Sequence, residues 1–227
     1  MPHDVHIGKL HPAKSYSLIM AFLTPLEGHY ASALKLIDEA HAQDPNKIPS
    51  ADGSADEVPY ELHYAHKMTR WLAPRCPDAS PALQIACRAQ HFRRWELPRS
   101  SYPMTRAGYL TWRTKQKAQA AAQVKEMLGS MEGPLPADDL DRISALISKQ
   151  DLATNEETQV LEDVACLVFL DDQFDDFEKK PEYDDDKIIS ILQKTWGKMS
   201  PKGREMALQM KHSDRALSLL GRALQGA

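Results

Sequence analysis

The segment from 155 to 177, NEETQVLEDVACLVFLDDQFDDF, limits the fold more than any other part of the chain. Its large apolar residues lie around most of the circumference of a helix; they are Val160, Leu161, Val164, Leu167, Val168 and Leu170. A helix that is apolar on nearly all sides must be covered by other elements. The segment therefore predicts a central helix around which the rest of the chain packs.

Helical spacing recurs along the chain, and no segment alternates apolar and polar residues over the length of a strand. The expected helices cover residues 29–44, 61–73, 81–95, 104–128, 138–150, 155–177, 184–195 and 201–224. Ser80 followed by Pro81 is a typical helix start, and Pro45 and Gly129 end helices. We therefore predict an all-α fold, a bundle of about eight helices with no sheet. Residues 1–28 would form an N-terminal arm, and residues 29–227 a single helical domain.

Composition restricts the class of protein. The chain has 227 residues and a formal net charge of −4, which argues against a surface that binds nucleic acid or an anionic membrane as a whole. Its three cysteines, Cys76, Cys87 and Cys166, are widely spaced without a CxxC pair, so we expect reduced thiols and a cytoplasmic protein. The apolar run from 17 to 23 is too short to cross a bilayer, and no membrane partner is expected.

One stretch, RAQHFRRWELPRSSYPMTR at 88–106, is strongly basic: it holds five arginines and one acid, Glu96. Arginine binds phosphate or carboxylate through two parallel hydrogen bonds and stacks on aromatic rings, which also occur here. The residues expected to bind an anionic ligand are Arg94, Arg99, Tyr102, Arg106, Arg113 and Lys149. Lys149 lies at a helix end, where capping of backbone carbonyls is its alternative role.

Two acids, Glu162 and Asp163, interrupt the apolar helix. Burial of a carboxylate is costly unless a partner, a proton or a metal ion compensates it. One explanation is ion pairing with arginines of the 88–113 segment, and the other is a metal ion held together with His91. Glu61, near the start of the second helix, is a third carboxylate of this kind. A lone histidine is also typical of a core where it bonds a backbone carbonyl, so the residues alone leave these explanations open.

Acids are concentrated between residues 162 and 186. They are Glu162, Asp163, Asp171, Asp172, Asp175, Asp176, Glu178, Glu182, Asp184, Asp185 and Asp186. Bridges between these acids and the arginines of the 88–113 segment would serve the fold alone. The run after Asp171 lacks the glycine and the spaced oxygens of an EF-hand loop, so we expect a solvated loop there.

The stretch LQIACRAQH resembles the apolar helix before the His-Asp pair of the HD-domain metal-dependent phosphohydrolases, with Gln90-His91 in place of that pair. In this resemblance Glu61 stands for the first histidine of that family, and Glu162 or Asp163 for its last aspartate. The resemblance implies an HD-like helical frame and a divalent ion (Mn, Fe or Zn) bound by His91, Glu162 and Asp163. It also implies that these residues and Glu61 are catalytic.

A wider resemblance, to the domain-of-unknown-function family 4202, covers the chain from about His29. It is based on AHAQDPN, ELHYAHKMTRWL, RAQHFRRWELPRSSYPMTRAGYLTWR, LEDVACLVFL and KTWGKMS. That family is placed near the HD-like folds, and its members are often labelled glutamyl-tRNA synthetases. HIGK at 6–9 and KMSPK at 198–202 do resemble synthetase signatures, but those act on a Rossmann sheet, for which this chain has no βαβ pattern. A helix start at Ser200-Pro201 explains the second motif more simply.

These observations predict a metal-dependent hydrolase of a small anionic, phosphorylated metabolite. The ion would lower the pKa of a bound water, and Arg94, Arg99 and Arg106 would neutralise the substrate. A metal-dependent oxygenase on the same frame is a variant, since histidine and carboxylate also bind iron. The alternative from another class is a non-catalytic module that binds an anionic ligand, or RNA, through the arginines and aromatic rings.

Overall fold

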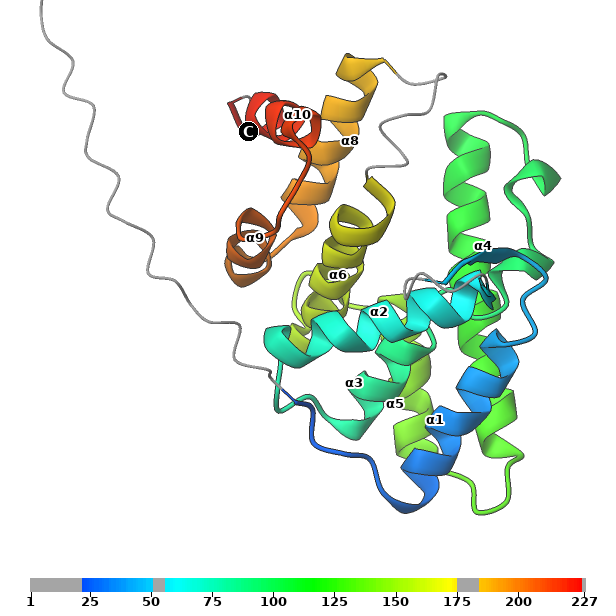
Figure 1. Ribbon diagram of the computed structural model, residues 1–227. Coiled ribbons are helices and arrows are strands. Elements are labelled where there is room, and N and C mark those ends of the chain that lie inside the picture. Colours follow the sequence, from blue (N-terminus) through cyan, green and yellow to red (C-terminus); the bar gives the residue numbers. More distant parts are fainter. Residues whose placement is uncertain (1–21, 51–55, 175–183, 226–227) are drawn as a thin grey trace, which may run out of the picture.

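The computed structural model describes residues 22–50, 56–174 and 184–225 (Figure 1). The α-helices in these ranges are α1 (Gly28–His41), α2 (Tyr60–Arg75), α3 (Pro81–Arg88), α4 (Arg106–Gly129), α5 (Ala137–Ser148), α6 (Glu156–Val168), α8 (Asp185–Lys198), α9 (Pro201–Leu208) and α10 (Asp214–Gln225). Two 3-10 turns, η1 (Arg94–Glu96) and η2 (Arg99–Ser101), precede α4, and a π-helical turn, η3 (Phe169–Gln173), continues α6. The all-α prediction is confirmed. Within the described ranges, none of the helices is both long enough and apolar enough to span a membrane.

The expectation of no sheet was wrong in one place. The strands β1 (Lys47–Pro49) and β2 (Glu57–Pro59) pair antiparallel, with Ile48 opposite Val58. Each of these two β-branched residues precedes a proline, and a residue before proline is driven towards extended backbone. The ribbon is short, and it leads directly into α2.

Helix α6 is central, as its composition predicts. Val160, Leu161 and Val164 are buried in a hydrophobic core formed with residues of α1 to α5. Leu167 and Leu170 belong to a second core, formed with α8, α9 and α10. In Figure 1 those three helices lie together on one side of α6, and the long α4 lies on the other side of the molecule. Because α6 supplies buried residues to both cores, it joins them. Each fully buried leucine or valine contributes about 1.5–3 kcal/mol to the stability of the fold.

The third helix is shorter than its sequence pattern suggests. Ser80 caps α3 through its hydroxyl, and Pro81 takes the first helical position, as predicted. The helix ends at Arg88 because the backbone soon turns left-handed, with φ of 63° at His91 and 47° at Arg93. The expectation that His91 lies within a helix was therefore wrong, and it lies instead in the turn that precedes η1.

The last expected helix is divided into α9 and α10. Ser200 caps α9 by accepting the N–H of Gly203 at 3.1 Å, and Pro201 takes the first position of that helix. The helix start predicted from Ser200-Pro201 is confirmed, and it accounts for this part of the KMSPK motif.

Candidate anion-binding site

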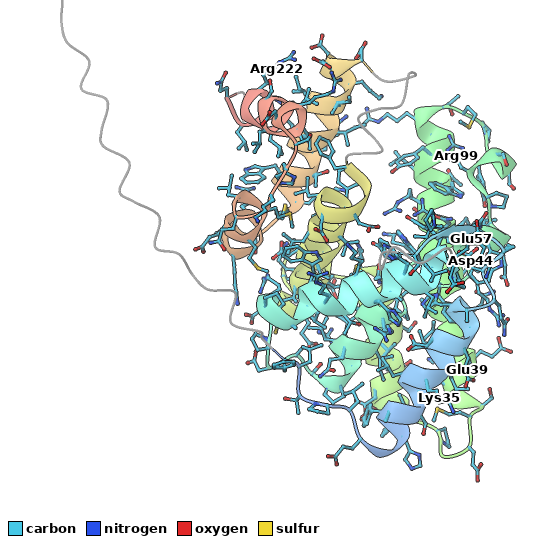
Figure 2. The ribbon with its side chains drawn as sticks, in the orientation of Figure 1. Lys35, Glu39, Asp44, Glu57, Arg99 and Arg222 are labelled. Atoms are coloured by element: carbon cyan, nitrogen blue, oxygen red, sulfur yellow. The ribbon has the colours of Figure 1, made fainter. Side chains whose placement is uncertain are left out.

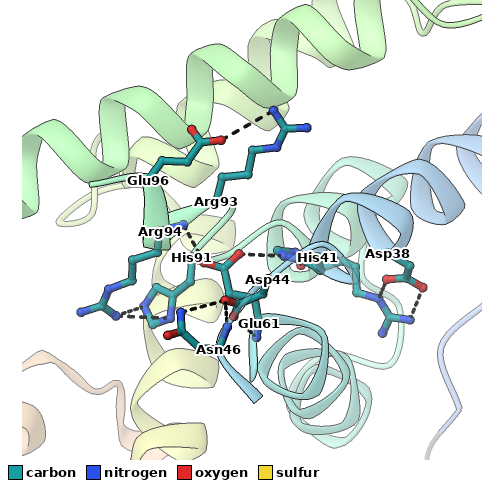
Figure 3. A network of polar contacts seen from close by, with 10 residues as sticks. Asp38, His41, Asp44, Asn46, Glu61, His91, Arg93, Arg94 and Glu96 are labelled. Atoms are coloured by element: carbon teal, nitrogen blue, oxygen red, sulfur yellow. Dashed lines mark hydrogen bonds and ion pairs between the residues drawn. The ribbon is translucent and has the colours of Figure 1, made fainter. Parts of the chain in front are cut away.

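The turn between α3 and η1 directs two consecutive arginines to different places. Arg93 extends towards Glu96, with 3.8 Å between Nη1 and Oε1, whereas Arg94 extends towards His91 (Figure 3). A non-glycine residue in the left-handed region costs on the order of 1–3 kcal/mol. Since two such residues lie in this turn, its surroundings must enforce its shape.

The buried carboxylate of Glu61 is the main contact that holds the turn. Its Oε1 accepts the backbone N–H of Arg94 at 2.6 Å, and its Oε2 lies 3.1 Å from Nδ1 of His41. The other ring nitrogen of His41, Nε2, donates to the carbonyl oxygen of Arg88 at 3.0 Å. Burial raises the pKa of Glu61, and His41 opposes that shift.

Further contacts tie this pair to the surrounding helices (Figure 3). Asp44 accepts the backbone N–H of Glu61 at 3.0 Å, and Arg88 binds Asp38 through two nitrogens at 2.6 and 2.9 Å. Both carboxylate oxygens of Glu61 are thus engaged by protein groups. Glu61 therefore fixes the position of the Arg94 backbone by a hydrogen bond to its N–H group.

The side chains of His91 and Arg94 contact each other and two aromatic residues. The His91 ring stacks on Tyr64, with 4.2 Å between ring centroids and 18° between planes. Nη1 of Arg94 lies 3.1 Å from His91 Nε2, and its guanidinium lies 4.9 Å from the centroid of Trp112. Burial lowers the pKa of Arg94, and Arg113 lowers it further. Burial also holds the pKa of His91 well below its ordinary value, with Arg94, Arg113 and Lys149 acting in the same direction, so His91 is neutral near pH 7.

Four more cations act on His91, on Arg94 or on one another. Arg113 and Lys117 are one turn apart on α4, Lys149 follows α5 with a φ of 57°, and Lys198 ends α8. We call Arg94, Arg113, Lys117, Lys149 and Lys198 the cationic cluster. Arg94, Arg113 and Lys149 all lower the pKa of His91. Arg113, Lys149 and Lys198 lower the pKa of Lys117, and the same three act on the carboxylate of Glu162.

Four members of the cationic cluster, Arg113, Lys117, Lys149 and Lys198, interact with a single buried carboxylate, Glu162 of α6. Lys149 donates a hydrogen bond to Glu162 Oε2, and Lys198 Nζ lies 3.7 Å from Oε1. Burial would raise the pKa of Glu162, but Lys149, Lys198 and Arg113 together lower it. Burial lowers the pKa of Lys117, and Lys149 and Arg113 add to that shift. Within the described residues, Arg94, Arg113 and Lys117 form no ion pair with any acid.

The adjacent acid, Asp163, lies in different surroundings. Its fully buried carboxylate accepts hydrogen bonds from Arg75 Nε at 2.8 Å, from the Ser200 backbone N–H at 2.8 Å and from Gln159 Nε2 at 3.0 Å. A methyl group added at Gly203 would approach it to 2.7 Å. Asp163 therefore fastens α2 and the start of α9 to α6.

The remaining predicted ligand-binding residues lie in the segment that leads into α4 and at its first position. Arg99, labelled in Figure 2, lies beside α4. It donates to the carbonyl oxygens of Tyr102 and Pro103 at 3.0 and 2.7 Å, which fixes the turn before α4. Tyr102 is half-buried, and Arg106 is exposed at the first position of α4. The structure thus brings together His91, Arg94, Arg113, Lys149 and Glu162 but leaves these three residues outside the cationic cluster.

Two members of the cationic cluster were missing from the predicted site. Lys117 lies four residues after Arg113, and this spacing on a predicted helix is a signal that could have identified it. Lys198 had no such signal, because its place depends on how α8 packs against α6. Tyr64, which supports His91, was also missed.

The structure also bears on bridges between the basic and acidic segments. In the part of the chain that the structure describes, no arginine from 88 to 113 pairs with an acid from 162 to 186. Asp171 and Asp172 instead bind Lys67 of α2, and Asp172 also contacts His63 at 2.7 Å. The acids at 175, 176, 178 and 182 lie outside the described residues.

The fold and this site define an all-helical protein with a partly buried group of cations that outnumber the acids they pair with in the described residues. A family model described as a domain of unknown function (DUF4202) matches residues 31–220, and the chain belongs to this family. No curated protein and no solved structure matches the chain. The resemblance to HD-domain phosphohydrolases stays a prediction.

Proposed function

We propose that this protein binds a small, multiply charged anion of the phosphorylated-metabolite class at the cationic cluster. The observation that carries the proposal is the imbalance of charge: four cations of the cluster act on one carboxylate, Glu162, and the fifth, Arg94, forms no ion pair within the described residues. Burial of a charge without a partner is costly. A bound anion would supply the missing negative charge.

Three other arginines that connect helices each pair with one acid. Arg88 binds Asp38, Arg75 binds Asp163 and Arg142 binds Glu157. Arg94 differs, because within the described residues its guanidinium pairs with no acid and instead contacts the neutral ring of His91 and the face of Trp112. This contrast favours a ligand-binding role for the cationic cluster over a structural one.

The side chains of the cluster match the chemistry of phosphate. Guanidinium groups such as those of Arg94 and Arg113 bind two phosphate oxygens at once, and lysines add compact charges around them. Neutral His91 would gain affinity for a proton beside a bound anion, and it could then donate a further hydrogen bond.

Metal-dependent hydrolysis has less support from the donor arrangement. Within the described ranges, no group of three or more His, Cys, Asp or Glu side chains is placed so that it could hold a metal ion. Hydrolysis or oxygenation with an ion at His91, Glu162 and Asp163 stays a prediction that elemental analysis of the purified protein would test.

The proposal is tested by calorimetric titration with inorganic pyrophosphate. Lys117→Gln removes one cation of the cluster, and Lys115→Gln is a matched control because Lys115 is exposed on the same helix. We expect pyrophosphate to bind the wild type and Lys115→Gln alike, and Lys117→Gln at least tenfold more weakly. Equal affinity in all three proteins, or no binding, would overturn the proposal.

A single-stranded RNA oligonucleotide tests the alternative partner. If the protein binds RNA with an affinity that falls steeply with salt, and both lysine variants weaken it equally, a broad basic surface is the binding element. The proposal predicts no such binding.

A further inference from the structure

A surface hollow of about 190 Å³ lies beside the cationic cluster. Its wall includes the aromatic rings of Tyr60, Trp95 and Trp112, the side chain of Arg94, and the amides of Asn46 and Gln116. The first helical turn of α2, η1 and the middle of α4 supply most of these groups. Aromatic rings and a guanidinium are surfaces on which other planar groups stack.

The hollow and the cationic cluster meet at Arg94, which belongs to both. Its guanidinium contacts His91 on the cluster side, and it also lines the hollow, next to Trp112. Residues that follow one another in a helix are rotated by about 100°. Trp112 and Gln116 therefore share one face of α4, and Arg113 and Lys117 share the adjacent face. A ligand bound in both the hollow and the cationic cluster would therefore span two adjacent faces of α4.

The two amides of the hollow each keep a free acceptor in the described residues. Asn46 Nδ2 donates to Asp44 at 2.8 Å, and Gln116 Nε2 donates to the carbonyl oxygen of Leu97 at 3.2 Å. These bonds orient the amides and leave Oδ1 of Asn46 and Oε1 of Gln116 without a protein donor. Two fixed carbonyl oxygens at the edge of an aromatic hollow suit the N–H or amino groups of a planar ring.

We propose that the hollow holds a planar heteroaromatic ring that is covalently attached to the anionic group, so that the ligand is a mononucleotide-like heteroaromatic phosphate. This inference depends on the proposed function, since the cationic cluster would bind the phosphate. Stacking of a base on aromatic side chains contributes roughly 1–3 kcal/mol, which corresponds to a gain in affinity of about five- to 150-fold. A ring that stacks on Arg94 also covers the cation whose charge the phosphate neutralises.

The experiment compares ligands that share a phosphate and differ in the ring. The probes are the 5′-monophosphates of adenosine, guanosine, cytidine and uridine, together with ribose 5-phosphate and inorganic phosphate, titrated calorimetrically into the wild type. We expect at least one nucleotide to bind tenfold more tightly than ribose 5-phosphate. If no nucleotide exceeds ribose 5-phosphate while that sugar phosphate still binds, this inference is overturned and the proposed function stands. If none of the probes binds, both are overturned.

Two variants locate the ring. Trp95→Ala removes a half-buried wall of the hollow and leaves every member of the cationic cluster in place. It should lower nucleotide affinity to within about threefold of ribose 5-phosphate, with ribose 5-phosphate affinity unchanged. Asn46→Ala, at an exposed position, should reduce the preference for the tightest nucleotide. Retention of the full preference in both variants would place the ring elsewhere and contradict the inference.

Discussion

Glu162 and Asp163 are neighbours in α6, and both are buried, yet the charges around them differ. Asp163 is matched by one arginine and by the hydrogen-bond donors at the start of α9. Glu162 lies among lysines and arginines that outnumber it. Asp163 is thus balanced within the protein, whereas the partly buried cations around Glu162 exceed it, and this excess is the basis of the proposed anion site. Under the proposed function, the first acid belongs to the ligand site, whereas the second joins α2 and the start of α9 to α6.

The largest effect that separates the two acids is on stability. Asp163→Asn should lower the free energy of unfolding by about 3–5 kcal/mol, because Arg75 would be left buried without its partner. Urea denaturation with and without saturating pyrophosphate measures this loss, which the ligand should not specifically repair. Glu162→Gln is the matched variant: its loss should be smaller, and pyrophosphate should recover most of it. If pyrophosphate restored the stability of Asp163→Asn but not that of Glu162→Gln, the distinction between the two acids would be wrong.

If Asp163→Asn does not fold, Ser200→Ala tests the same joint more gently. It removes the cap of α9, and caps of this kind contribute on the order of 1 kcal/mol. The affinity for pyrophosphate should stay within about twofold of the wild type, since Ser200 lies outside the cationic cluster.

An effect of intermediate size concerns pH and His91. Its pKa in the folded protein lies well below the ordinary value of 6.5, so below pH 6.5 the unfolded chain binds a proton that the folded protein does not. Stability should therefore fall with decreasing pH, by up to about 1.4 kcal/mol per pH unit from this group. His91→Asn, which tolerates a left-handed turn, should remove that part of the slope between pH 6.5 and 5. An unchanged slope would show that His91 does titrate freely in the folded protein.

Much of the fold follows from local sequence, but the shape of the site does not. The apolar circumference of residues 155–177 predicts the central helix, and Ser80-Pro81 and Ser200-Pro201 predict two helix starts that the structure confirms. The end of α3 could not be predicted in this way, because Glu61 enforces the turn at His91 from 30 residues earlier in the chain. The apolar spacing of the sequence continues through that turn, but the hydrogen bond from the Arg94 N–H to Glu61 sets its backbone conformation.

The same limit applies to the candidate site. The density of arginines pointed to Arg94 and Arg113 as members of an anion site, and the structure places them together. Sequence could not separate Glu162 from Asp163, because adjacent residues of a helix face directions about 100° apart and the partners come from other helices. Lys198 and Arg75, which distinguish the two acids, are brought in by α8 and α2.

The smallest effect in magnitude tests the central claim most directly, and it is the stability of Lys117→Gln with and without pyrophosphate. Like charges four residues apart on a helix cost about 0.2–0.5 kcal/mol, and Lys149 lies nearby as well. Without ligand, Lys117→Gln should therefore be more stable than the wild type by about 0.5 kcal/mol, and Lys115→Gln should not be. With saturating pyrophosphate, the order should reverse, because the wild type binds the anion more tightly. A Lys117→Gln protein that is less stable than the wild type under both conditions would contradict the account, since the lysine would then serve the fold rather than a ligand.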